Sequence, residues 1–498
     1  MQVYHDEDAD LGLLEGGQIA VIGYGNQGRA QALNLRDSGL DVIVGNREDD
    51  YAERAQEDGF PVLPIAQATV EADIVMLLIP DEVTPAVFEA DVAPHLAEGN
   101  VLVFASGYNV AFGFITPPPF VDVVLVAPRM IGAGVRDLYV AGRGFPSFIG
   151  VAQDPSGRAK EIALALAKGI GSTRAGVVET TFAQEAELDL FTEQCFGPAF
   201  GHVLTTAVEL LLEEGYPPEA VLLELYMSGE LSYTLGKIAE LGLIEQSELH
   251  SHTSQYGSMS RGMRFILPEL RNRMQEGLEE IRSGRFAQEW AAEQAAGCPT
   301  LKMLKEAARS LPLHRLEREL REALRSIPGP PPAYGEARVG SKRRVKKGWA
   351  WLRRLKEWLG GKPGVPPLAV LSKAQMEQVL LKFLAHAASD PALREFAAGQ
   401  SLTTHYVLSD VGLEFHLRFQ EGEVTGGLGP PLSPAKVCLT MASDVLDGMF
   451  TGRVNAMRAA MTGKLSFRGD ARVAMGMQQI QNDLSRLYNL ARKEVVGG

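Results

Sequence analysis

Short apolar runs alternate with helical stretches along the first part of the chain. The runs are QIAVIG, DVIVG, DIVMLLIP, NVLVFAS and DVVLVAP. Continuous apolar runs of this length are typical of strands that are buried on both faces of a parallel sheet, with helices as crossover connections. The pattern therefore predicts a βαβ domain over residues 1–152.

The pattern changes twice further along the chain. Over residues 153–325 the strand signals vanish and long helical patterns take over, which predicts an all-α domain. Residues 326–367 contain SIPGPPPAYG and GKPGVPP, and nine Lys or Arg but no Asp or Glu lie between Arg338 and Lys356, so we expect a basic linker. Residues 368–498 predict a helix, the alternating strands THYVLS, LEFHLRF and KVCLTM, and two more helices, which makes a small α+β domain.

Composition and charge narrow the functional class. A chain of 498 residues is long enough for two or three domains, and its apolar fraction of 46% is that of a globular protein. The net charge of -14 argues against a nucleic-acid binder, which needs a basic surface. Cys195, Cys298 and Cys438 form no metal or redox spacing, and neither a signal peptide nor an unbroken apolar run of membrane-spanning length is present. We expect a soluble, cytoplasmic protein.

A glycine-rich turn follows the first predicted strand. Gly23-Tyr24-Gly25-Asn26-Gln27-Gly28 lies between QIAVIG and the helical stretch RAQALNLRDSG. Glycines at this spacing allow a tight turn and a close approach of the backbone to a pyrophosphate, which then sits at the helix N-terminus. We therefore predict that the first domain is a Rossmann domain that binds NAD(P), with Pro80 at the end of DIVMLLIP in the same site. The alternative is a tight strand–helix turn without a ligand.

The end of the second strand bears on the choice of cofactor. Glu48, Asp49 and Asp50 lie about 20 residues beyond the last glycine, where a carboxylate binds the ribose hydroxyls of NAD. Arg47 could instead hold the 2′-phosphate of NADP. The three acids would repel that phosphate, so we favour NAD(H) over NADP(H), with Asp50 as the ribose ligand. Charged residues in such a loop can also be merely solvated.

Several stretches resemble ketol-acid reductoisomerase over essentially all of residues 1–325. They are GYGNQGRAQALNLRDSG, GYNVAFG, VDVVLVAPR, AKGIGSTRAGVVETTF, ELDLFTEQ, SHTSQYG and EIRSGRFAQEWAAEQAAG. The resemblance implies a knotted helical domain, two Mg²⁺ ions, an alkyl migration in an acetohydroxy acid, and reduction of the resulting ketone by NAD(P)H. Because the family's second ligand helix packs across subunits, it also implies a homodimer or a higher homo-oligomer.

The metal ligands that the resemblance implies are only partly present. Asp189 and Glu193 are spaced i,i+4, so both carboxylates face one side of a helix and suit Mg²⁺. Glu224 matches the first acid of the family's other ligand helix, but Ser228 stands where the family has a second acid. Glu230 lies six residues after Glu224, a rotation of about 240° round a helix, so it cannot simply replace the missing acid.

Two further departures fall at positions that handle protons. Ser106 stands where the family has a histidine, and Arg129 stands where it has a lysine, which can lose a proton as arginine cannot. Arg129 could still bind a carboxylate or an enolate oxygen as a fixed cation. Ser251 matches the serine that contacts the substrate carboxylate. His250 and His252 beside it are either proton-transfer groups or ordinary surface histidines.

Residues 368–498 resemble a sterol-carrier-protein domain, on VCLTMASDVLDGMFTGRVNAMRAAMTGKLSFRGD and ARVAMGMQQIQNDL. That family encloses an apolar tunnel between a five-stranded sheet and its helices. A lipid or other apolar ligand would suit an adaptable cavity, and ordinary core packing is the alternative. The cavity residues would be Met441, Met449, Phe450, Met457, Met461, Met475 and Met477. The basic, tryptophan-rich segment 346–359 predicts an amphipathic helix that docks on an anionic membrane or on the chain itself.

Three functional hypotheses remain. The first is a working ketol-acid reductoisomerase of branched-chain amino-acid synthesis, whose small-molecule substrate is an acetohydroxy acid. The second is a divergent NAD(P)-dependent reductase without the isomerase step, which acts on an apolar or lipid-linked carbonyl substrate presented by the carrier domain. The third is a catalytically silent protein that binds or senses lipid. The glycine turn and the Asp189/Glu193 pair favour an enzyme, and Ser106, Arg129 and Ser228 favour the second hypothesis over the first.

Overall fold

The computed structural model describes residues 2–324, 371–454, 459, 464–469 and 480–496. They divide into two compact units, one holding residues 2–199 and 229–299, and the other residues 200–228, 300–324 and the described residues from 371 onward. The predicted linker 326–367 and the amphipathic helix within it lie outside the described residues.

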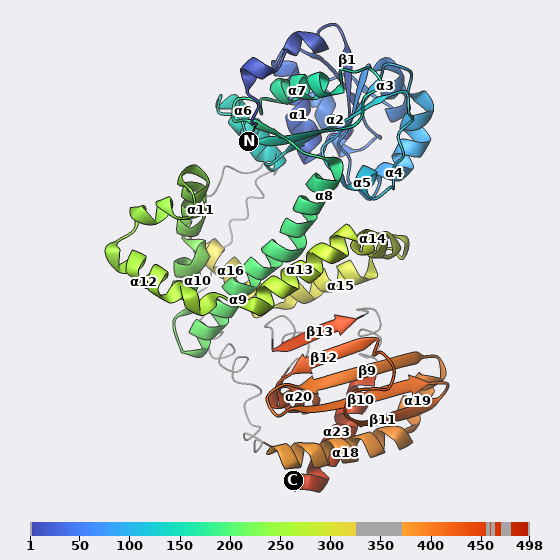
Figure 1. Ribbon diagram of the computed structural model, residues 1–498, viewed down its shortest axis with the longest axis vertical. Helices are drawn as coiled ribbons and strands as arrows, with labels where there is room; N and C mark the ends of the chain where they lie inside the picture. The colour runs from blue at the N-terminus through green and yellow to red at the C-terminus, as the bar shows by residue number, and fades with distance from the viewer. Residues whose placement is uncertain (1, 325–370, 455–458, 460–463, 470–479, 497–498) are drawn as a thin grey trace. The chain divides into compact units, whose positions relative to one another are not determined.

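The first unit contains an eight-stranded sheet with the strand order β3-β2-β1-β4-β5-β6-β7-β8 (Figure 1). All neighbouring strands are parallel except β6 and β7. From β1 the chain proceeds outward to β3, then returns to place β4 on the other side of β1, so the topological switch point lies between β1 and β4. The strands are β1 (Gln18–Ile22), β2 (Asp41–Gly45), β3 (Val62–Leu63), β4 (Ile74–Leu77), β5 (Val101–Phe104), β6 (Asp122–Pro128), β7 (Ser147–Gln153) and β8 (Val177–Glu179).

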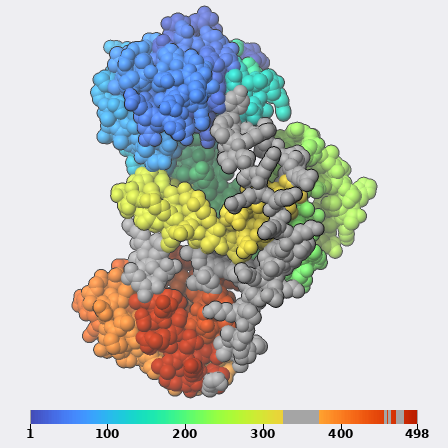
Figure 2. Space-filling view, turned by 180° about the vertical axis from the view of Figure 1, so that it is seen from behind, coloured from blue at the N-terminus to red at the C-terminus, as the bar shows by residue number. Residues whose placement is uncertain are grey.

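The five apolar runs form β1, β2, β4, β5 and β6, which confirms the predicted parallel sheet. Both faces of this sheet are covered, because successive residues of β1 enter different cores. Ile19 and Val21 pack with α1 (Asn26–Asp37), α6 (Gly132–Val140) and α7 (Ala159–Ile170), whereas Ala20 and Ile22 pack with α3 (Ile65–Glu71). The result is a closely packed body, drawn in blue in Figure 2.

The sheet continues beyond residue 152, where we placed the end of the α/β domain. Strand β7 ends at Gln153, and β8 returns after helix α7 to pair in parallel with β7. The sequence VVE of β8 is too short to stand out as an apolar run, and a two-residue strand such as β3 gives no periodic signal.

The region from residue 182 to residue 324 is helical, as predicted. Helix α8 leaves the α/β part (Figure 1) and continues through the π turn η5 into α9. Thr181 starts α8 with a capping box, in which Thr181 and Gln184 satisfy each other's backbone amides. The helices are α8 (Phe182–Phe191), η5 (Thr192–Phe196), α9 (Gly197–Glu213), α10 (Pro218–Leu222), the π turn η6 (Leu223–Met227), α11 (Glu230–Leu241), η7 (Glu245–Leu249), α12 (His252–Gly262), η8 (Met263–Phe265), α13 (Pro268–Arg282), α14 (Arg285–Ala295), α15 (Pro299–Ser310) and α16 (Pro312–Ala323).

The continuous helix Phe182–Glu213 is long and apolar enough, by length and composition, to cross a membrane, and it is the one such stretch within the described ranges. We expected none, because we counted only unbroken apolar runs, and polar residues interrupt this helix. Core helices of soluble proteins have the same composition. We draw no further conclusion about a membrane from this helix.

The C-terminal domain of the second unit contains a five-stranded sheet of order β11-β10-β9-β12-β13, in which only β9 and β12 are parallel. Alternate residues of β9 and β10 are buried, so one face lies on the core and the other is open. The predicted strands are confirmed as β9, β10 and β12. The elements are α18 (Lys373–Ser389), α19 (Pro391–Ala398), β9 (Ser401–Leu408), β10 (Leu413–Gln420), β11 (Glu423–Leu428), β12 (Val437–Met441), α20 (Ser443–Phe450), β13 (Leu465–Gly469) and α23 (Gln481–Val496).

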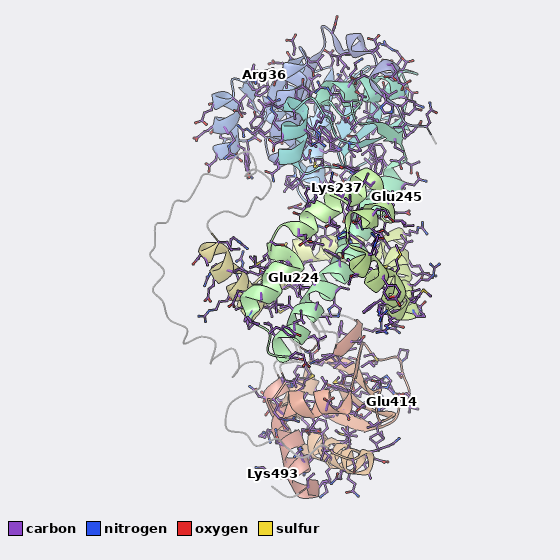
Figure 3. All side chains as sticks on the ribbon, turned by 90° about the vertical axis from the view of Figure 1, so that its left-hand side faces the viewer. Arg36, Glu224, Lys237, Glu245, Glu414 and Lys493 are labelled. Carbon is purple, nitrogen blue, oxygen red and sulfur yellow. The ribbon has the colours of Figure 1, made fainter. Side chains whose placement is uncertain are left out.

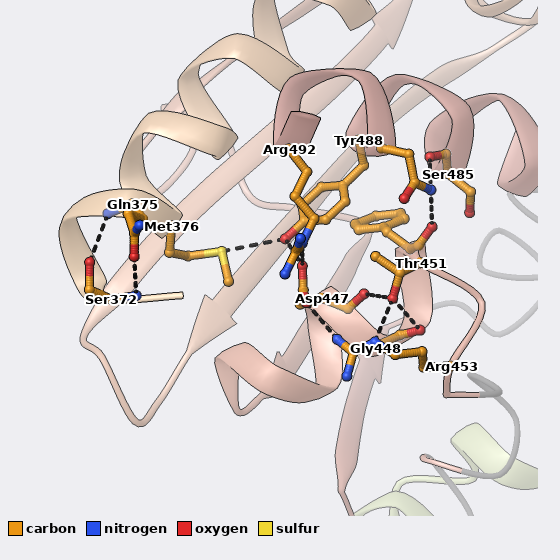
Figure 4. Close-up of polar contacts among 12 residues, drawn as sticks. Ser372, Gln375, Met376, Asp447, Gly448, Thr451, Arg453, Ser485, Tyr488 and Arg492 are labelled. Carbon is orange, nitrogen blue, oxygen red and sulfur yellow. Dashed lines mark hydrogen bonds and ion pairs between the residues drawn. The ribbon is translucent and has the colours of Figure 1, made fainter. Parts of the chain in front are cut away.

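A buried ionic cluster joins α20 to α23 in this domain (Figure 4). Asp447 is 4% exposed and accepts hydrogen bonds from the Tyr488 hydroxyl at 3.0 Å and from Arg492 Nε at 2.8 Å. Arg453 binds its other oxygen at 2.5 Å. Burial and the Asp447 carboxylate raise the pKa of Tyr488 well above its usual range, so it stays a neutral donor. One carboxylate thus holds two helices and two arginines together.

Replacing that carboxylate should destabilise this domain. Asp447→Asn keeps the shape but removes the negative charge that Arg492 and Arg453 share, so we expect a loss of about 2–4 kcal/mol. Scanning calorimetry of the full chain should show the transition that contains this domain at lower temperature. The control is Asp483→Asn, which removes a surface pair with Arg486 and should cost less than about 0.5 kcal/mol. Equal shifts in the two variants would contradict the proposed importance of the cluster.

Candidate functional site

The glycine turn lies directly after β1, at the topological switch point of the sheet. Gly23 has φ 93°, and a side chain on Gly28 would meet the Gly23 carbonyl oxygen at 2.0 Å, so both positions require glycine. Gly25 caps the N-terminus of α1 without a side-chain hydrogen bond, and a side chain there would meet no atom within 4 Å. The first amides of α1 therefore face open space, as an anion site at a helix N-terminus requires.

The side chains of Tyr24 and Gln27 pack against the protein, whereas that of Asn26 is exposed. Tyr24 is 1% exposed and donates its hydroxyl proton to Asp58 at 2.9 Å, while Arg29 binds the same carboxylate at 2.6 Å. Arg29 accordingly lowers the pKa of Asp58, and burial together with Asp58 raises the pKa of Tyr24 above its usual range. Gln27 donates to the Met130 carbonyl at 2.9 Å, and Asn26 is the first residue of α1. A cofactor at this turn would contact the backbone and the exposed Asn26 side chain.

The loop after β2 presents one arginine and three acids. Asp49 caps helix α2 (Asp50–Glu57) by accepting from the amides of Tyr51 and Ala52, and it pairs with Arg47 at 2.7 Å. This pairing lowers the pKa of Asp49. Asp50 is the exposed first residue of α2, and it is not occupied by the capping contacts. Its role as ribose ligand stays a prediction, as does that of Pro80, which is exposed three residues after the end of β4.

A second group of polar residues gathers at the carboxyl ends of β4, β5 and β6. Asp81 follows β4, Gly107 follows β5, and Arg129 follows β6 directly. Helix α8 closes on them, because an added side chain on Gly107 would lie 2.2 Å from the Phe182 carbonyl oxygen. This approach lets the Gly107 amide donate to the buried Glu185 carboxylate at 2.6 Å. Carboxyl ends of parallel strands are where ligands bind in open α/β sheets.

Arg129 is fixed in this group by three contacts. One terminal nitrogen binds Glu185 at 2.7 Å, the other binds Asp189 at 3.2 Å, and the guanidinium lies 4.9 Å from the centre of the Phe148 ring. The next residue, Met130, accepts the hydrogen bond from Gln27, so the Arg129 segment packs directly on the glycine turn. The predicted cation is therefore placed beside the predicted cofactor turn.

The group carries more negative than positive charge. Burial, followed by repulsion from Glu185 and other carboxylates, raises the pKa of Asp81 to about 6. Burial also raises the pKa of Glu185, against the lowering effect of the Gly107 amide and Arg129. The pKa of Glu193 is raised by desolvation and then by Asp189. Such crowded carboxylates favour a proton or a bound cation.

The predicted Ser106 lies in the same group and accepts from the Tyr108 amide at 3.3 Å. Tyr108 is nine-tenths buried, and its hydroxyl is among the few buried side-chain atoms of the described residues that have no hydrogen-bond partner. Burial and Asp81 raise its pKa to about 12. A buried hydroxyl group usually has a partner, and a polar atom of a ligand would supply one here.

The predicted metal residues are divided between the units. Asp189 and Glu193 lie one turn apart, where α8 passes into the π turn η5, and π turns are frequent at functional sites. Glu224 is exposed on the π turn η6 in the second unit (Figure 3). The helix then ends at Ser228 and Gly229, whose φ is 91°, and Glu230 begins a new helix. The rotation of about 240° between Glu224 and Glu230 assumed one continuous helix, so that argument does not apply. No three acids, histidines or cysteines of the described residues form a metal cluster by themselves.

Ser251 is exposed at the start of α12, where its hydroxyl accepts from the Ser254 amide at 3.3 Å. It acts as a helix cap in this structure, and substrate contact through Ser251 stays a prediction. His250 pairs with Gln246 at 3.3 Å, and His252 is the exposed first residue of α12. Neither histidine is placed in the Arg129 group by a contact of the described residues.

Residues 13–176 match the family described as acetohydroxy acid isomeroreductase, NADPH-binding domain, and residues 182–326 match ketol-acid reductoisomerase, C-terminal domain. The ketol-acid reductoisomerase (NADP(+)) of Pyrobaculum calidifontis is 46% identical over 325 residues, which are 65% of this chain and 98% of that protein. That of Methanopyrus kandleri is 45% identical over 326 residues, with the same shares.

A solved structure agrees with these relatives. The NADH-preferring ketol-acid reductoisomerase from an uncultured archaeon is 39% identical, with a TM-score of 0.62, and the match covers 66% of this chain and 100% of that one.

The chain belongs to the ketol-acid reductoisomerase family. Residues 380–482 match the SCP-2 sterol transfer family, so this ketol-acid reductoisomerase relative is fused to a sterol-carrier domain. It is an NAD(P)-dependent oxidoreductase, as predicted, and the three successive fold classes are confirmed.

Three residues of this site were missed in the sequence, although each left a signal. Asp81 directly follows Pro80 at the end of a strand, where site residues of α/β sheets gather. Glu185 precedes Asp189 by four residues, so it shares the helix face of the predicted metal pair. Tyr108 belongs to the GYNVAFG stretch that we used only for the family resemblance. Their depth of burial was what the sequence could not supply.

The raised pKa of Asp81 makes the stability of this reductoisomerase relative depend on pH. Asp81 titrates at about 6 in the folded chain against 3.8 ordinarily, so its favourable contribution is complete below pH 3.8 and is lost as the pH rises through about 6. Asp81→Asn does not titrate, and wild type should lose about 2 kcal/mol relative to it between pH 4 and pH 7.

Thermal unfolding in EDTA across this pH range tests the prediction. The exposed Glu89, changed to Gln, should leave the wild-type profile unaltered. Parallel profiles for wild type and Asp81→Asn would show that Asp81 does not titrate in this range.

Proposed function

We propose that the chain reduces a 2-keto or acetohydroxy-acid-like substrate with NAD(P)H, assisted by Mg²⁺. The observation that carries this proposal is the position of Arg129, which is anchored on Glu185 and Asp189 and packs through Met130 on the glycine turn. A small substrate with a carboxylate or a ketone oxygen would meet a fixed cation beside the cofactor turn. Ser106 adds a hydroxyl group after the end of β5, and the buried Tyr108 hydroxyl interacts electrostatically with Asp81.

NADH is the cofactor we favour, as in the solved relative, whereas the curated relatives are named for NADP(+). Arg47 is the cation that could hold a 2′-phosphate, and Asp49 neutralises it at 2.7 Å. Glu48 and Asp50 add negative charge on either side. A phosphate at this loop would therefore displace an ion pair and meet two further acids.

The carboxylates of α8 and η5 fit one divalent cation. Asp189 and Glu193 lie on one side of the helix. Burial, and after it the neighbouring carboxylates, raise the pKa values of Glu193 and Asp81, and a bound cation would offset that negative charge. Mg²⁺ held there would polarise a carbonyl oxygen of the substrate. The second metal site lacks this support, because Ser228 and a helix end replace its second acid.

The proton for the substrate must come from a group other than the family's lysine, which Arg129 replaces here. Arg129 cannot give up its proton at neutral pH, so its part is to bind and orient. Asp81, with a pKa of about 6, is partly protonated near neutrality and is positioned by the Asn109 side chain, which donates to Asp81 Oδ1 at 3.3 Å. We infer that Asp81 supplies the proton that the carbonyl oxygen takes up on reduction.

A reductase without the isomerase step is the alternative that two observations favour. Arg129 already occupies one oxygen of Asp189, and Ser228 removes an acid from the second metal site. Alkyl migration needs metal ions that hold two substrate oxygens, whereas hydride transfer needs a bound cofactor, a polarised carbonyl and a proton. A catalytically silent lipid-binding protein is the remaining hypothesis.

Cofactor oxidation distinguishes these possibilities. With Mg²⁺ and NADH or NADPH, wild type should reduce 2-keto-3-hydroxy-isovalerate at least about tenfold faster than it consumes 2-acetolactate, because only the latter needs migration. The double change Arg129→Lys and Ser228→Glu should raise 2-acetolactate turnover by about tenfold or more and leave the ketone reduction within severalfold.

Equal rates on both substrates in wild type would instead establish the complete reductoisomerase reaction. Oxidation of neither cofactor with either substrate would overturn the enzyme proposal. Ser228→Glu alone serves as the matched control for the Lys substitution.

We also propose that the chain is a homodimer through its helical region. The segment from α11 to η8 exposes large apolar side chains, among them Tyr256 at 70%, Met263 at 74% and Phe265 at 76%. Monomeric proteins rarely expose a contiguous apolar patch of this kind. A second copy of this chain is the occupant that the family resemblance supports.

Light scattering after size-exclusion chromatography tests the dimer. Wild type should have twice the chain mass of 53.9 kDa or a higher multiple. Met263→Lys with Phe265→Glu places two charges on the exposed patch and should shift the protein toward monomer at micromolar concentration. Leu432→Lys, a fully exposed apolar position of the C-terminal domain, should not. A monomeric wild type would contradict the proposal.

The sterol-carrier domain makes a lipid or other apolar ligand the proposed second partner of the chain. Met441, Met449 and Phe450 lie in its buried core, which fits both the predicted ligand cavity and the alternative of ordinary core packing. The other four predicted methionines lie outside the described residues. Membrane contact through segment 346–359 stays a prediction for the same reason. The three cysteines are free thiols, which suits the proposed cytoplasmic location.

A further inference from the structure

The open face of the sterol-carrier sheet carries a cluster of polar side chains. On β9 the buried residues Thr404 and Tyr406 alternate with His405, which faces the other way. Cys438 of β12 is the direct neighbour of His405 in the register. Glu414 lies on the adjoining strand β10 and is labelled in Figure 3. Three strands thus bring a thiol, an imidazole and a carboxylate to one face.

The imidazole of His405 bridges the other two groups. Its Nε2 lies 2.9 Å from Glu414 Oε2, and its Nδ1 lies 3.8 Å from Cys438 Sγ. A carboxylate that accepts from Nε2 keeps the proton on that nitrogen, which leaves the Nδ1 lone pair facing the thiol. Nucleophile, base and orienting acid are therefore in the order that activated nucleophiles use.

The other neighbour of Cys438 is a basic residue. In the β12–β13 ladder Cys438 is paired with Arg468, so the strand register places an imidazole on one side of the cysteine and an arginine position on the other. Direct cross-strand neighbours on one face have Cβ atoms about 5 Å apart. Reactive cysteines occur in such partly exposed, electropositive surroundings, whereas buried structural cysteines are inert. Among the described residues, the side chain directly opposite His405 on β10 is His416, which is hydrogen-bonded to the Gly429 carbonyl at 3.0 Å.

We propose that Cys438 is a nucleophilic thiol that is modified by soft carbon electrophiles, with His405 as its base and Glu414 as a positioning residue. The thiol proton passes to His405 Nδ1, sulfur forms a bond to the electrophilic carbon, and the leaving group departs with its electron pair. The imidazolium then returns the proton to water. This site is independent of the reductase site in the first unit.

Alkylation of the full-length chain by iodoacetamide at pH 7, followed by mass spectrometry of each cysteine peptide, tests the proposal. Cys298 is the internal reference, because it is also partly exposed, whereas Cys195 is buried. We expect Cys438 to react about tenfold faster than Cys298 in the native protein. In denaturant the two rates should agree within about twofold, because the cluster is then lost.

Substitutions show whether Cys438 reacts because His405 and Glu414 activate it or merely because it is exposed to solvent. His405→Asn should slow Cys438 by about tenfold although it opens the site, and Glu414→Gln should slow it severalfold while the sheet is retained. His416→Asn changes the same face without touching the thiol and should leave the rate unchanged. A Cys438 rate equal to that of Cys298, or one that survives both His405→Asn and Glu414→Gln, would overturn the assignment.

Discussion

The close approach of helix α8 to the end of β5 is the contact on which the oxidoreductase site depends. It exists because Gly107 has no side chain, so the Phe182 carbonyl can come against the strand end. The Gly107 amide then fixes Glu185, and Glu185 fixes Arg129. That contact brings the helix that carries Asp189 and Glu193 against the carboxyl edge of the sheet, and it holds Arg129, whose next residue packs on the glycine turn.

Charge is the second constraint on this site, and it follows from the first. Packing α8 on the sheet brings four carboxylates, those of Asp81, Glu185, Asp189 and Glu193, around one permanent cation. In a partly desolvated place this surplus must be met by protons or by metal ions. In our proposal Arg129 binds and orients the substrate and another group delivers the proton, because arginine keeps its charge. The family's scaffold is retained around this altered set of residues.

Local sequence patterns were sufficient to predict the main elements of the scaffold. Five apolar runs predicted the parallel strands, the glycine spacing predicted the turn at the switch point, and the quoted motifs predicted the family and the sterol-carrier fusion. The edge strands β3 and β8 were not predicted, because they are two and three residues long and carry no periodic pattern. The argument about Glu230 also failed locally, since it assumed one continuous helix where Gly229 adopts a left-handed conformation.

The sequence by itself determined what each segment is: its periodicity, its glycine turn, its family motifs and the residue types at the reacting positions. Only the tertiary structure decided which of those residues act together. Glu185 became a site residue because it binds Arg129, and Asp81 and Tyr108 did so because they are desolvated near it. Cys438, His405 and Glu414 met because strand register placed them on one face. Burial and register are long-range properties that depend on segments far apart in the chain, and pKa values and hydrogen-bond partners follow from them.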